Sequence, residues 1–326
     1  MVYHHKYEMK NFKMSDPVVL KDITFPETKG TLSKYYQLSK ISWLKVGGPA
    51  EFLFKPYDLG DLKNFVTRLC PDIPIFILGA CSNLLIRDGG IPGVSIKLGR
   101  NFNNIEIKKD KIKVGASVPT ARLAAMASDE GYDLAFLRTI PGTVGGAVKM
   151  NAGCYGRYVS DCLESVEVLG RNGAITEFKK VDLGLSYRIS HLPKESIVIS
   201  ATFKKIIRDS KILKNEMQEA LRYRANVQPT DELSCGSTFK NPSGASSFGK
   251  SDENYKLSAW KLIDEAGCRG IKLGQAKVSE KHPNFLINMG GARASEIEDL
   301  GELVRKKVYE KHGINLNWEI KLVGKR

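Results

Sequence analysis

The stretch Thr139-Ile-Pro-Gly-Thr-Val-Gly-Gly-Ala-Val-Lys-Met-Asn-Ala-Gly153 decides how the fold of this chain is interpreted. It has glycine at positions 142, 145, 146 and 153, and small or apolar residues fill most of the positions between them. Such a run stabilises itself poorly, because glycine forgoes side-chain packing and loses extra backbone entropy on folding. The composition therefore indicates that the backbone closely approaches a flat or phosphorylated ligand. The alternative is a contact between helices that pack through small residues.

A second turn of small residues, Gly79-Ala-Cys-Ser-Asn83, follows the apolar run Pro74–Leu78. A strand that ends in small residues exposes successive backbone N–H groups to a phosphate, and Ser82 and Asn83 add side-chain donors. The turn lacks the GxGxxG pattern and no helix pattern follows it, so a dinucleotide-binding Rossmann turn is disfavoured. An ordinary turn between strands is the alternative.

Composition bounds the class of protein. The chain has 326 residues, which suggests about two domains at roughly 150 residues each. Apolar residues make up 42% and charged residues 26%, as in a typical folded globular protein. The net charge of +14 suits anionic partners such as nucleic acid, acidic lipid or phosphorylated small molecules. A lysine-rich surface with no such partner is an equally good interpretation of the charge alone.

Other features exclude several classes. No apolar run approaches the ~20 residues of a membrane-spanning helix, so we expect no membrane insertion. The six cysteines form no CxxC pair, which argues against a disulfide scaffold or a metal site and favours a reducing cytoplasm. Residues 1–20 are predicted to be an N-terminal leader, and its first residues lack the apolar core of a signal peptide.

Periodicity predicts an α+β chain. Between residues 50 and 204 short strands alternate with glycine and polar turns, and Asn172-Gly173 gives a strong hairpin signal. Composition shifts near Arg208, where a charged helix over Lys211–Asn226 is expected to turn Ile212, Leu213, Met217 and Leu221 inward. Further helices are predicted over Ser258–Ala266 and Ser295–His312, with strands near Gln275–Val278 and Asn284–Asn288.

The segment Ile314–Val323 alternates apolar and polar residues and is predicted to be the last strand. One face packs and the other is polar, so Glu319 is expected to point away from the core that Trp318 buries. A solvated acidic residue on an edge strand is the simpler interpretation of this segment alone.

Two more motifs carry candidate chemistry. Arg188, after Tyr187 and between apolar runs, suits bidentate binding of a carboxylate or phosphate, with a surface salt bridge as the alternative. Ser237, in the polar stretch Ser234–Pro242, could donate a proton or cap a turn. No catalytic-triad spacing and no GxSxG elbow accompany it, which argues against a nucleophilic hydrolase.

In their order along the chain, these motifs resemble those of the UDP-N-acetylenolpyruvoylglucosamine reductases, the flavoenzymes that complete UDP-N-acetylmuramate for peptidoglycan. The resemblance runs from about Ile41 to Gly324, and the glycine-rich run and Gly236–Pro242 are its most specific parts. The segment after Gly153 is short, so the chain resembles the second subclass, which lacks an extra substrate-covering loop. An insertion over Ser243–Tyr255 departs from the family pattern. The motifs are Lys45–Ala50, Gly79–Asn83, Ile140–Gly153, Tyr187-Arg188, Gly236–Pro242, Gln275 through Phe285, and Trp318-Glu319.

The resemblance implies a fold. It is an FAD-binding module of the p-cresol methylhydroxylase type over residues 21–209, made of two α+β subdomains with a break near residue 100. A smaller α+β substrate-binding domain follows over 210–312. The strand in 313–326 is expected to return to the FAD module, which would bring Glu319 to the active site.

The resemblance also implies an activity: FAD-dependent, NADPH-consuming reduction of UDP-N-acetylglucosamine enolpyruvate, by a protein expected to be a cytoplasmic monomer. A hydride from flavin N5 would reach the enolpyruvyl β-carbon, and Ser237 would protonate the α-carbon. Serine is a weak acid, so Lys240 or loop N–H groups would have to stabilise its alkoxide. Arg188 and Glu319 would stabilise the charge that develops toward the substrate carboxylate.

By motif position, the remaining site residues fall into two groups, and no metal ligand is among them. The expected cofactor-binding residues are Gly79, Ala80, Cys81, Ser82, Asn83, Leu84, Ile140, Pro141, Gly142, Gly145, Gly146, Asn151 and Gly153. The expected substrate-binding residues are Tyr187, Lys240, Asn241, Gln275, His282 and Asn284.

Two other classes remain open at this point. One is a flavin oxidase or dehydrogenase of the same fold that acts on an alcohol, because fold alone does not settle function. The other is a basic protein that binds nucleic acid. The sequence carries no RNP, helix-turn-helix or zinc-finger signature, which argues against the second class.

Overall fold

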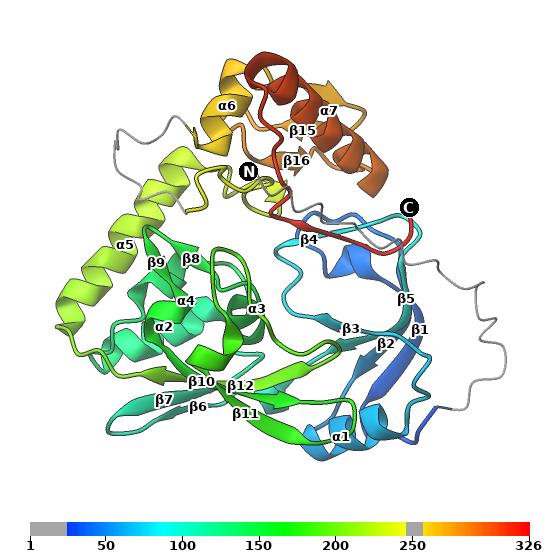
Figure 1. Cartoon of the computed structure of the whole chain (residues 1–326), viewed down its shortest axis with the longest axis vertical. Coiled ribbons are helices and arrows are strands. Elements are labelled where there is room, and N and C mark those ends of the chain that lie inside the picture. Colours follow the sequence, from blue (N-terminus) through cyan, green and yellow to red (C-terminus); the bar gives the residue numbers. More distant parts are fainter. Residues whose placement is uncertain (1–24, 246–256) are drawn as a thin grey trace, which may run out of the picture.

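The computed structural model describes residues 25–245 and 257–326 (Figure 1). The predicted leader over 1–20 lies outside these residues, as does most of the Ser243–Tyr255 insertion. Two sheets lie side by side below a smaller third unit (Figure 1). The mixture of helices and strands confirms the α+β class.

The first sheet has the strand order β1-β2-β5-β3. The strands β2, β5 and β3 are parallel, and β1 is antiparallel to β2. The connection from β2 to β3 is the amphipathic helix α1, which Asp58 caps by accepting from the Asp61 N–H at 2.8 Å. The bounds are β1 Thr31–Gln37, β2 Pro49–Lys55, α1 Leu59–Arg68, β3 Ile75–Leu78 and β5 Ile91–Lys97.

The second sheet has the order β11-β10-β12-β7-β6, and all its neighbours are antiparallel. The hairpin predicted at Asn172-Gly173 is confirmed between β10 and β11. The change from the first sheet to the second falls between Lys97 and Ile105, near the break that we expect at residue 100. The bounds are β6 Ile105–Ile107, β7 Lys111–Gly115, α2 Thr120–Asp129, α3 Val144–Lys149, β8 Gly153–Cys154, β9 Arg157–Tyr158, α4 Val159–Cys162, β10 Leu163–Leu169, β11 Ile175–Lys179 and β12 Ile197–Lys204.

The third unit is a short sheet, β13-β16-β15-β14, with α7 packed on the sheet and α6 packed against α7. The helix predicted over Ser295–His312 is confirmed as α7, whose apolar stripe is buried at Ile297, Leu300, Val304 and Val308 and partly buried at Leu303. The helix ends at Gly313, whose φ of 68° suits glycine. The bounds are β13 Leu233–Ser234, α6 Ala259–Glu265, β14 Lys272–Leu273, β15 Ala276–Val278, β16 Leu286–Asn288 and α7 Ala294–His312.

The helix α5 (Ser210–Val227) corrects two predictions. Leu213 and Met217 are buried as expected, but Ile212 is 51% exposed and Leu221 is 36% exposed. The two buried residues pack in the core of the second sheet, together with α2. The helix α5 therefore packs with the second sheet's core, and the domain boundary near residue 210 stays a prediction.

The C-terminal segment also differs from its prediction. Only Lys321–Val323 (β17) forms a strand, and it pairs in parallel with β4 (Leu84–Ile86) in the first half of the chain. Before β17, Trp318 makes an isolated bridge with Phe239. Glu319 is 9% exposed, so the simpler interpretation as a solvated acidic residue is wrong. Trp318 packs against the core of the third unit, whereas Glu319 faces Arg188 at a different surface of the segment. The reason is a charged partner, Arg188, which a pattern of alternation does not reveal.

The third unit is tied to the turn after β4 by polar contacts. The Arg87 guanidinium donates from Nε and Nη2 to the two oxygens of Glu298, each at 2.9 Å. The Asp88 carboxylate accepts from the N–H groups of Ala294 and Ser295, at 2.8 and 2.9 Å. Asp88, from a distant segment, therefore provides an acceptor for the free N–H groups in the first turn of α7, as a helix N-cap does.

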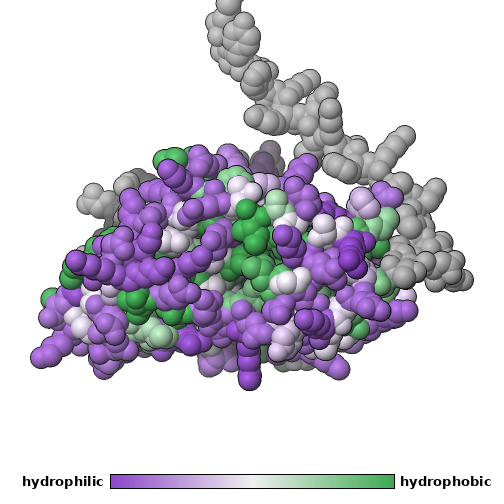
Figure 2. Space-filling view, turned by 90° about the horizontal axis from the view of Figure 1, so that it is seen from below, coloured by the Kyte–Doolittle hydropathy of each residue, from purple (hydrophilic) through white to green (hydrophobic). Residues whose placement is uncertain are grey.

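Other features are general. Short 3-10 helices lie at Leu38–Lys40, Arg100–Phe102, Ala135–Thr139 and Lys180–Leu183. No helix within residues 25–245 and 257–326 is long and apolar enough to cross a membrane. All six cysteines are free thiols. Seen from below, hydrophilic residues cover most of the surface, and hydrophobic residues gather in a patch near its centre (Figure 2).

Candidate active site

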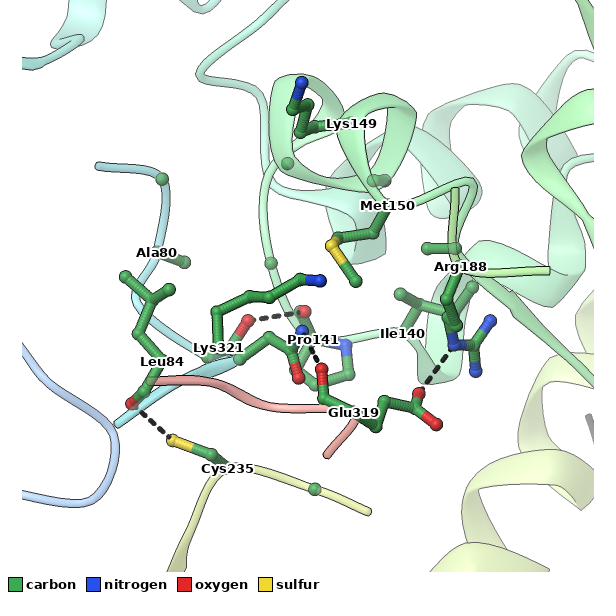
Figure 3. Close-up of a pocket in the computed structure, with 18 of the residues that line it drawn as sticks. Ala80, Leu84, Ile140, Pro141, Lys149, Met150, Arg188, Cys235, Glu319 and Lys321 are labelled. Atoms are coloured by element: carbon green, nitrogen blue, oxygen red, sulfur yellow. Dashed lines mark hydrogen bonds and ion pairs between the residues drawn. The ribbon is translucent and has the colours of Figure 1, made fainter. Parts of the chain in front are cut away.

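A cavity of about 1380 Å³ lies where the two large sheets meet the third unit (Figure 3). Both small-residue turns line it, and so do Arg188, Ser237 and Glu319. Its volume exceeds the ~300–1,000 Å³ of an ordinary small-ligand pocket, so it has room for a dinucleotide and part of a second ligand. Residues from positions 75 to 323 of the sequence therefore converge on one space.

The turn Gly79–Asn83 leaves the carboxyl end of β3 and forms one wall of the cavity. Cys81 has a φ of 56°, and the N–H groups of Ala80, Cys81 and Ser82 donate to no backbone acceptor in the described part of the chain. The Ser82 hydroxyl donates to the Pro141 carbonyl at 2.8 Å, which joins this turn to the glycine-rich run. Consecutive free N–H groups in such a turn make an anion-binding surface.

The glycine-rich run has two structural roles. It contains the helix α3, where a Cβ on Gly145 would lie 3.1 Å from the Ala116 Cβ. A Cβ on Gly153 would lie 2.4 Å from the Tyr158 ring. These two glycines therefore permit close packing within the protein, which was the alternative interpretation of the run. Gly142 and Gly146 are less crowded, and Gly142 has a φ of 146° that favours glycine.

Arg188 and Glu319 form an ion pair at the cavity wall (Figure 3). The Arg188 Nε donates to the Glu319 Oε1 at 2.6 Å, and the Nη2 donates to the Gly153 carbonyl at 3.1 Å. The buried Nη1 has no partner within the described residues. Burial opposes the charge on the guanidinium, but Glu319 beside it holds the pKa of Arg188 above its ordinary value. The guanidinium is therefore charged and keeps one buried N–H group that no described residue accepts from.

Tyr187 completes this group. Its hydroxyl donates to the Glu319 Oε2 at 3.5 Å, and burial, together with the Glu319 charge, raises the pKa of that hydroxyl. The loop that carries Tyr187 and Arg188 is held by Asn151, whose side chain donates to the Ser186 carbonyl at 3.0 Å and accepts from the Ser160 N–H at 2.9 Å. Asn151 is 2% exposed and does not line the cavity, so it positions this loop instead of contacting a cofactor there.

Ser237 lies on a loop that is fixed on both sides. The Glu319 N–H donates to the Thr238 carbonyl, and the Lys240 N–H donates to the Asn317 carbonyl, each at 2.8 Å. The Asn284 side chain accepts from the Phe239 N–H and donates to the Phe239 carbonyl, both at 2.9 Å. The Ser237 hydroxyl itself has no hydrogen-bond partner within residues 25–245 and 257–326. It is therefore held at the cavity with its proton uncommitted.

The predicted substrate-binding residues divide by position. Tyr187, Asn241, His282 and Asn284 line the main cavity. Lys240 lines a neighbouring cavity of about 400 Å³, which Tyr187 and Asn241 also line. Gln275 is exposed in the turn before β15 and lines neither cavity. The structure brings together all the predicted cofactor-binding residues except Asn151.

Sequence reasoning missed several cations on the cavity wall, among them Lys97, Lys149 and Lys321. Burial lowers the pKa of each of these lysines, and Lys240 and Lys149 add to the effect at Lys321. Lys97 and Lys149 end regular elements and Lys321 begins one, and an isolated lysine there is usually a surface residue. Their common signal is the net charge of +14, which predicts cations without placing them.

Comparison with known proteins defines the class first. A family model described as "FAD binding domain" matches residues 50–179. These residues include both small-residue turns, so the class is a flavoprotein with the expected p-cresol methylhydroxylase-type module. A second model, the C-terminal domain of UDP-N-acetylenolpyruvoylglucosamine reductase, matches residues 228–323.

The relatives then specify the family. The UDP-N-acetylenolpyruvoylglucosamine reductase of Paracoccus denitrificans is 50% identical over 302 residues, covering 93% of this chain and 99% of its own. That of Ruegeria pomeroyi is 49% identical over 296 residues, covering 91% and 96%. The crystal structure of the Thermus caldophilus enzyme matches with a TM-score of 0.76 and 34% identity, over 91% of this chain and all of that one. The chain belongs to the UDP-N-acetylenolpyruvoylglucosamine reductase family and is an oxidoreductase.

Proposed function

We propose that this reductase converts UDP-N-acetylglucosamine enolpyruvate to UDP-N-acetylmuramate with Ser237 as the proton donor, Arg188 stabilising the developing negative charge, and Glu319 orienting Arg188. The observation that carries the proposal is the convergence of these three side chains, from distant segments, on one cavity. The reduction itself is the reaction that names the family, and the roles of the residues are our proposal.

The residues of the cavity fit FAD. The Gly79–Asn83 turn presents N–H groups without backbone acceptors in the described chain, which suits a diphosphate. Gly142 and Gly146, in the adjoining glycine-rich run, leave the wall open enough for a flat ring to approach. When bound, FAD supplies the hydride that reaches the enolpyruvyl β-carbon, after NADPH has reduced it.

Arg188 would bind the substrate carboxylate. Negative charge flows toward that carboxylate as the β-carbon receives a hydride, and a guanidinium stabilises it through charged hydrogen bonds. The Nη1 of Arg188 is uncommitted, while Glu319 and Gly153 fix the other nitrogens. Glu319 therefore orients the guanidinium, with the protonated Tyr187 hydroxyl donating to its second oxygen.

Ser237 would transfer its hydroxyl proton to the α-carbon. A serine can do so only where neighbours stabilise the resulting alkoxide. Lys240, three residues further on, and the loop N–H groups are the nearest such groups along the chain. Tyr187, Lys240, Asn241, His282 and Asn284 would surround the nucleotide sugar, while Gln275 contributes nothing to this proposal because it is remote from both cavities.

We further propose that the enzyme works in the cytoplasm as a monomer with NADPH as its reductant. One chain supplies every residue assigned above, so a single copy forms a complete site. The cationic cavity wall suits FAD, NADPH and a UDP-sugar, which all carry phosphates.

Anaerobic stopped-flow measurement of the two half-reactions tests the assignment of Ser237. In Ser237→Ala we expect NADPH to reduce the flavin nearly as fast as in the unmodified enzyme. Reoxidation by the enolpyruvyl sugar nucleotide should slow by about 100-fold or more, because a general acid typically contributes that much. The control is Ser117→Ala, which removes a cavity-lining hydroxyl that donates to the Gly99 carbonyl. Equal slowing of both half-reactions in Ser237→Ala would reject Ser237 as the acid.

A further inference from the structure

Lys97 occupies a distinctive place beside the first small-residue turn. It ends β5, directly opposite Leu78 at the end of the parallel strand β3. Parallel strands end at the same edge of a sheet, and ligands of such sheets bind beyond that edge. The Lys97 Nζ donates to the Gly79 carbonyl at 2.6 Å, and the side chain lines the main cavity.

The Lys97 ammonium has no anionic partner within the described residues, since none of their ion pairs includes it. The charged or ionisable neighbours that act on it are the Cys81 thiol and Lys55. Burial lowers the pKa of Lys97, which shows that the site is partly desolvated. A partly buried cation is costly unless something compensates its charge, and among the described residues one neutral carbonyl alone accepts from it.

We propose that Lys97 supplies the positive charge that binds the diphosphate of FAD at the Gly79–Asn83 turn. The inference rests on the proposed role of this turn and adds a residue that the family motif does not single out. The backbone N–H groups of the turn orient the diphosphate through hydrogen bonds, and Lys97 supplies the positive charge that neutralises it. By holding the Gly79 carbonyl, the same ammonium also turns that oxygen away from the incoming phosphates.

These two actions of Lys97 can be separated by substitution. Lys97→Arg keeps the charge and the donor. Lys97→Gln keeps a donor without the charge, and Lys97→Met removes both. Lys55→Met is the matched control, because it removes the neighbouring cation, which does not line the cavity.

The measurement is titration of the flavin-stripped full chain with FAD and with ADP, followed by flavin fluorescence and by competition, at 50 and 300 mM KCl. We expect Lys97→Met and Lys97→Gln to weaken FAD and ADP binding by roughly 10-fold to 100-fold. They should also reduce the salt dependence of binding, since one screened charge pair is lost. Lys97→Arg should stay near the unmodified protein, and so should Lys55→Met. UDP affinity should not change in any variant.

Several outcomes would overturn the proposal. If Lys97→Gln bound FAD with the affinity and salt dependence of the unmodified protein, Lys97 would serve only to hold the Gly79 carbonyl. If the Lys97 variants lost affinity for UDP but kept their affinity for ADP, Lys97 would bind the phosphates of the substrate and not those of FAD. If the unmodified chain itself failed to bind FAD, the proposed function of the turn would fail, whatever Lys97 does. A misfolded Lys97→Met would leave the comparison of Lys97→Arg with Lys97→Gln to decide.

Discussion

Arg188 combines fixed contacts with an uncommitted edge. Its side chain and that of Glu319 are 13% and 12% exposed, so the pair is largely desolvated. A buried pair of this kind contributes little net stability, but removing one partner leaves an uncompensated charge. The backbone of Arg188 is also constrained, with a φ of 58° that is unusual for a residue other than glycine. Strained residues held by their surroundings occur often at functional sites.

Glu319→Gln should separate the two half-reactions. The amide keeps the size of the carboxylate but removes the charge that orients Arg188. We expect reoxidation of the flavin by substrate to slow at least about 10-fold, because a charged hydrogen bond in the site is lost. Flavin reduction by NADPH should be nearly unchanged. Stopped-flow absorbance checks both rates.

The control for Glu319→Gln is Glu302→Gln. The Glu302 carboxylate also accepts hydrogen bonds from an arginine and from a tryptophan N–H. Its side chain, however, is 50% exposed and does not line the cavity. Both half-reactions should proceed normally in that variant. A Glu319→Gln enzyme with full turnover would return Glu319 to a purely structural role.

Among the loops, the one between β15 and β16 organises the Ser237 region. It carries Asn284, which holds both backbone groups of Phe239, and His282, whose ring packs edge-on against Phe285. The His282 Nδ1 accepts from the Asn284 N–H at 3.3 Å, so the imidazole serves this loop as a neutral acceptor. Burial lowers the pKa of His282 from 6.5 to about 4.

This depressed pKa makes the free energy of unfolding depend on pH. Between pH 6.5 and pH 4 the unfolded chain binds a proton at His282 that the folded chain does not. The stabilising contribution is therefore complete above pH 6.5 and is lost as the pH falls toward 4. From pH 7 to pH 5 the loss amounts to about 2 kcal/mol. Urea unfolding at the two pH values should show it, and His282→Gln should remove that part of the loss. His191→Gln, which replaces an exposed histidine, is the control. Equal behaviour of both variants would contradict the prediction.

Several elements could be predicted because local pattern and tertiary structure agree in them. The α7 stripe and the hairpin at Asn172-Gly173 are examples. Prediction failed where distant partners override the pattern. Ile314–Ile320 alternates like a strand but makes only an isolated bridge, because its neighbours are the Phe239 loop and Arg188. In α5, the apolar Ile212 and Leu221 remain exposed because one face of the helix packs, on α2 and the 3-10 helix Ala135–Thr139.

For the candidate site, motifs located the cavity-lining turns and the three proposed catalytic residues. Motifs could not separate residues that face the cavity from those that support it. Asn151 supports a loop, and Gly145 and Gly153 permit packing, although all three belong to the same glycine-rich run. Lys97 escaped prediction because its importance depends on a desolvated position between two strands, which the sequence around it does not show.

At the scale of the whole molecule, residues from the two large sheets and from the third unit line one cavity. The third unit is fastened to the turn after β4 by the Arg87–Glu298 pair and by the Asp88 cap on α7. Since the same turn follows the strand that pairs with β17, one region joins the flavin-binding walls to the residues around Ser237 and Glu319. Most of the face seen in Figure 2 is hydrophilic, as expected of an exposed surface.

Because one chain completes the site, we expect a monomer in solution that binds one flavin. Light scattering after size-exclusion chromatography should give a mass near 36.2 kDa at all loading concentrations. Absorbance of the released cofactor should give one flavin per chain. A stable dimer whose dissociation abolished flavin binding would contradict the prediction.

The pairing of β4 with β17 also sets the earliest point in synthesis at which the enzyme can complete its fold, because β17 is made last. Asn83 contacts the Glu319 carbonyl, 236 positions further along the chain. A ribosome that adds ~5–20 residues per second needs roughly 10–50 s to cover that separation. Throughout this interval β4 has been made without its partner, and an unpaired strand edge invites association with other nascent chains. Early burial of Leu85 and Ile86 would shorten that exposure. The order in which the parts of the chain fold therefore affects how much folded enzyme is recovered.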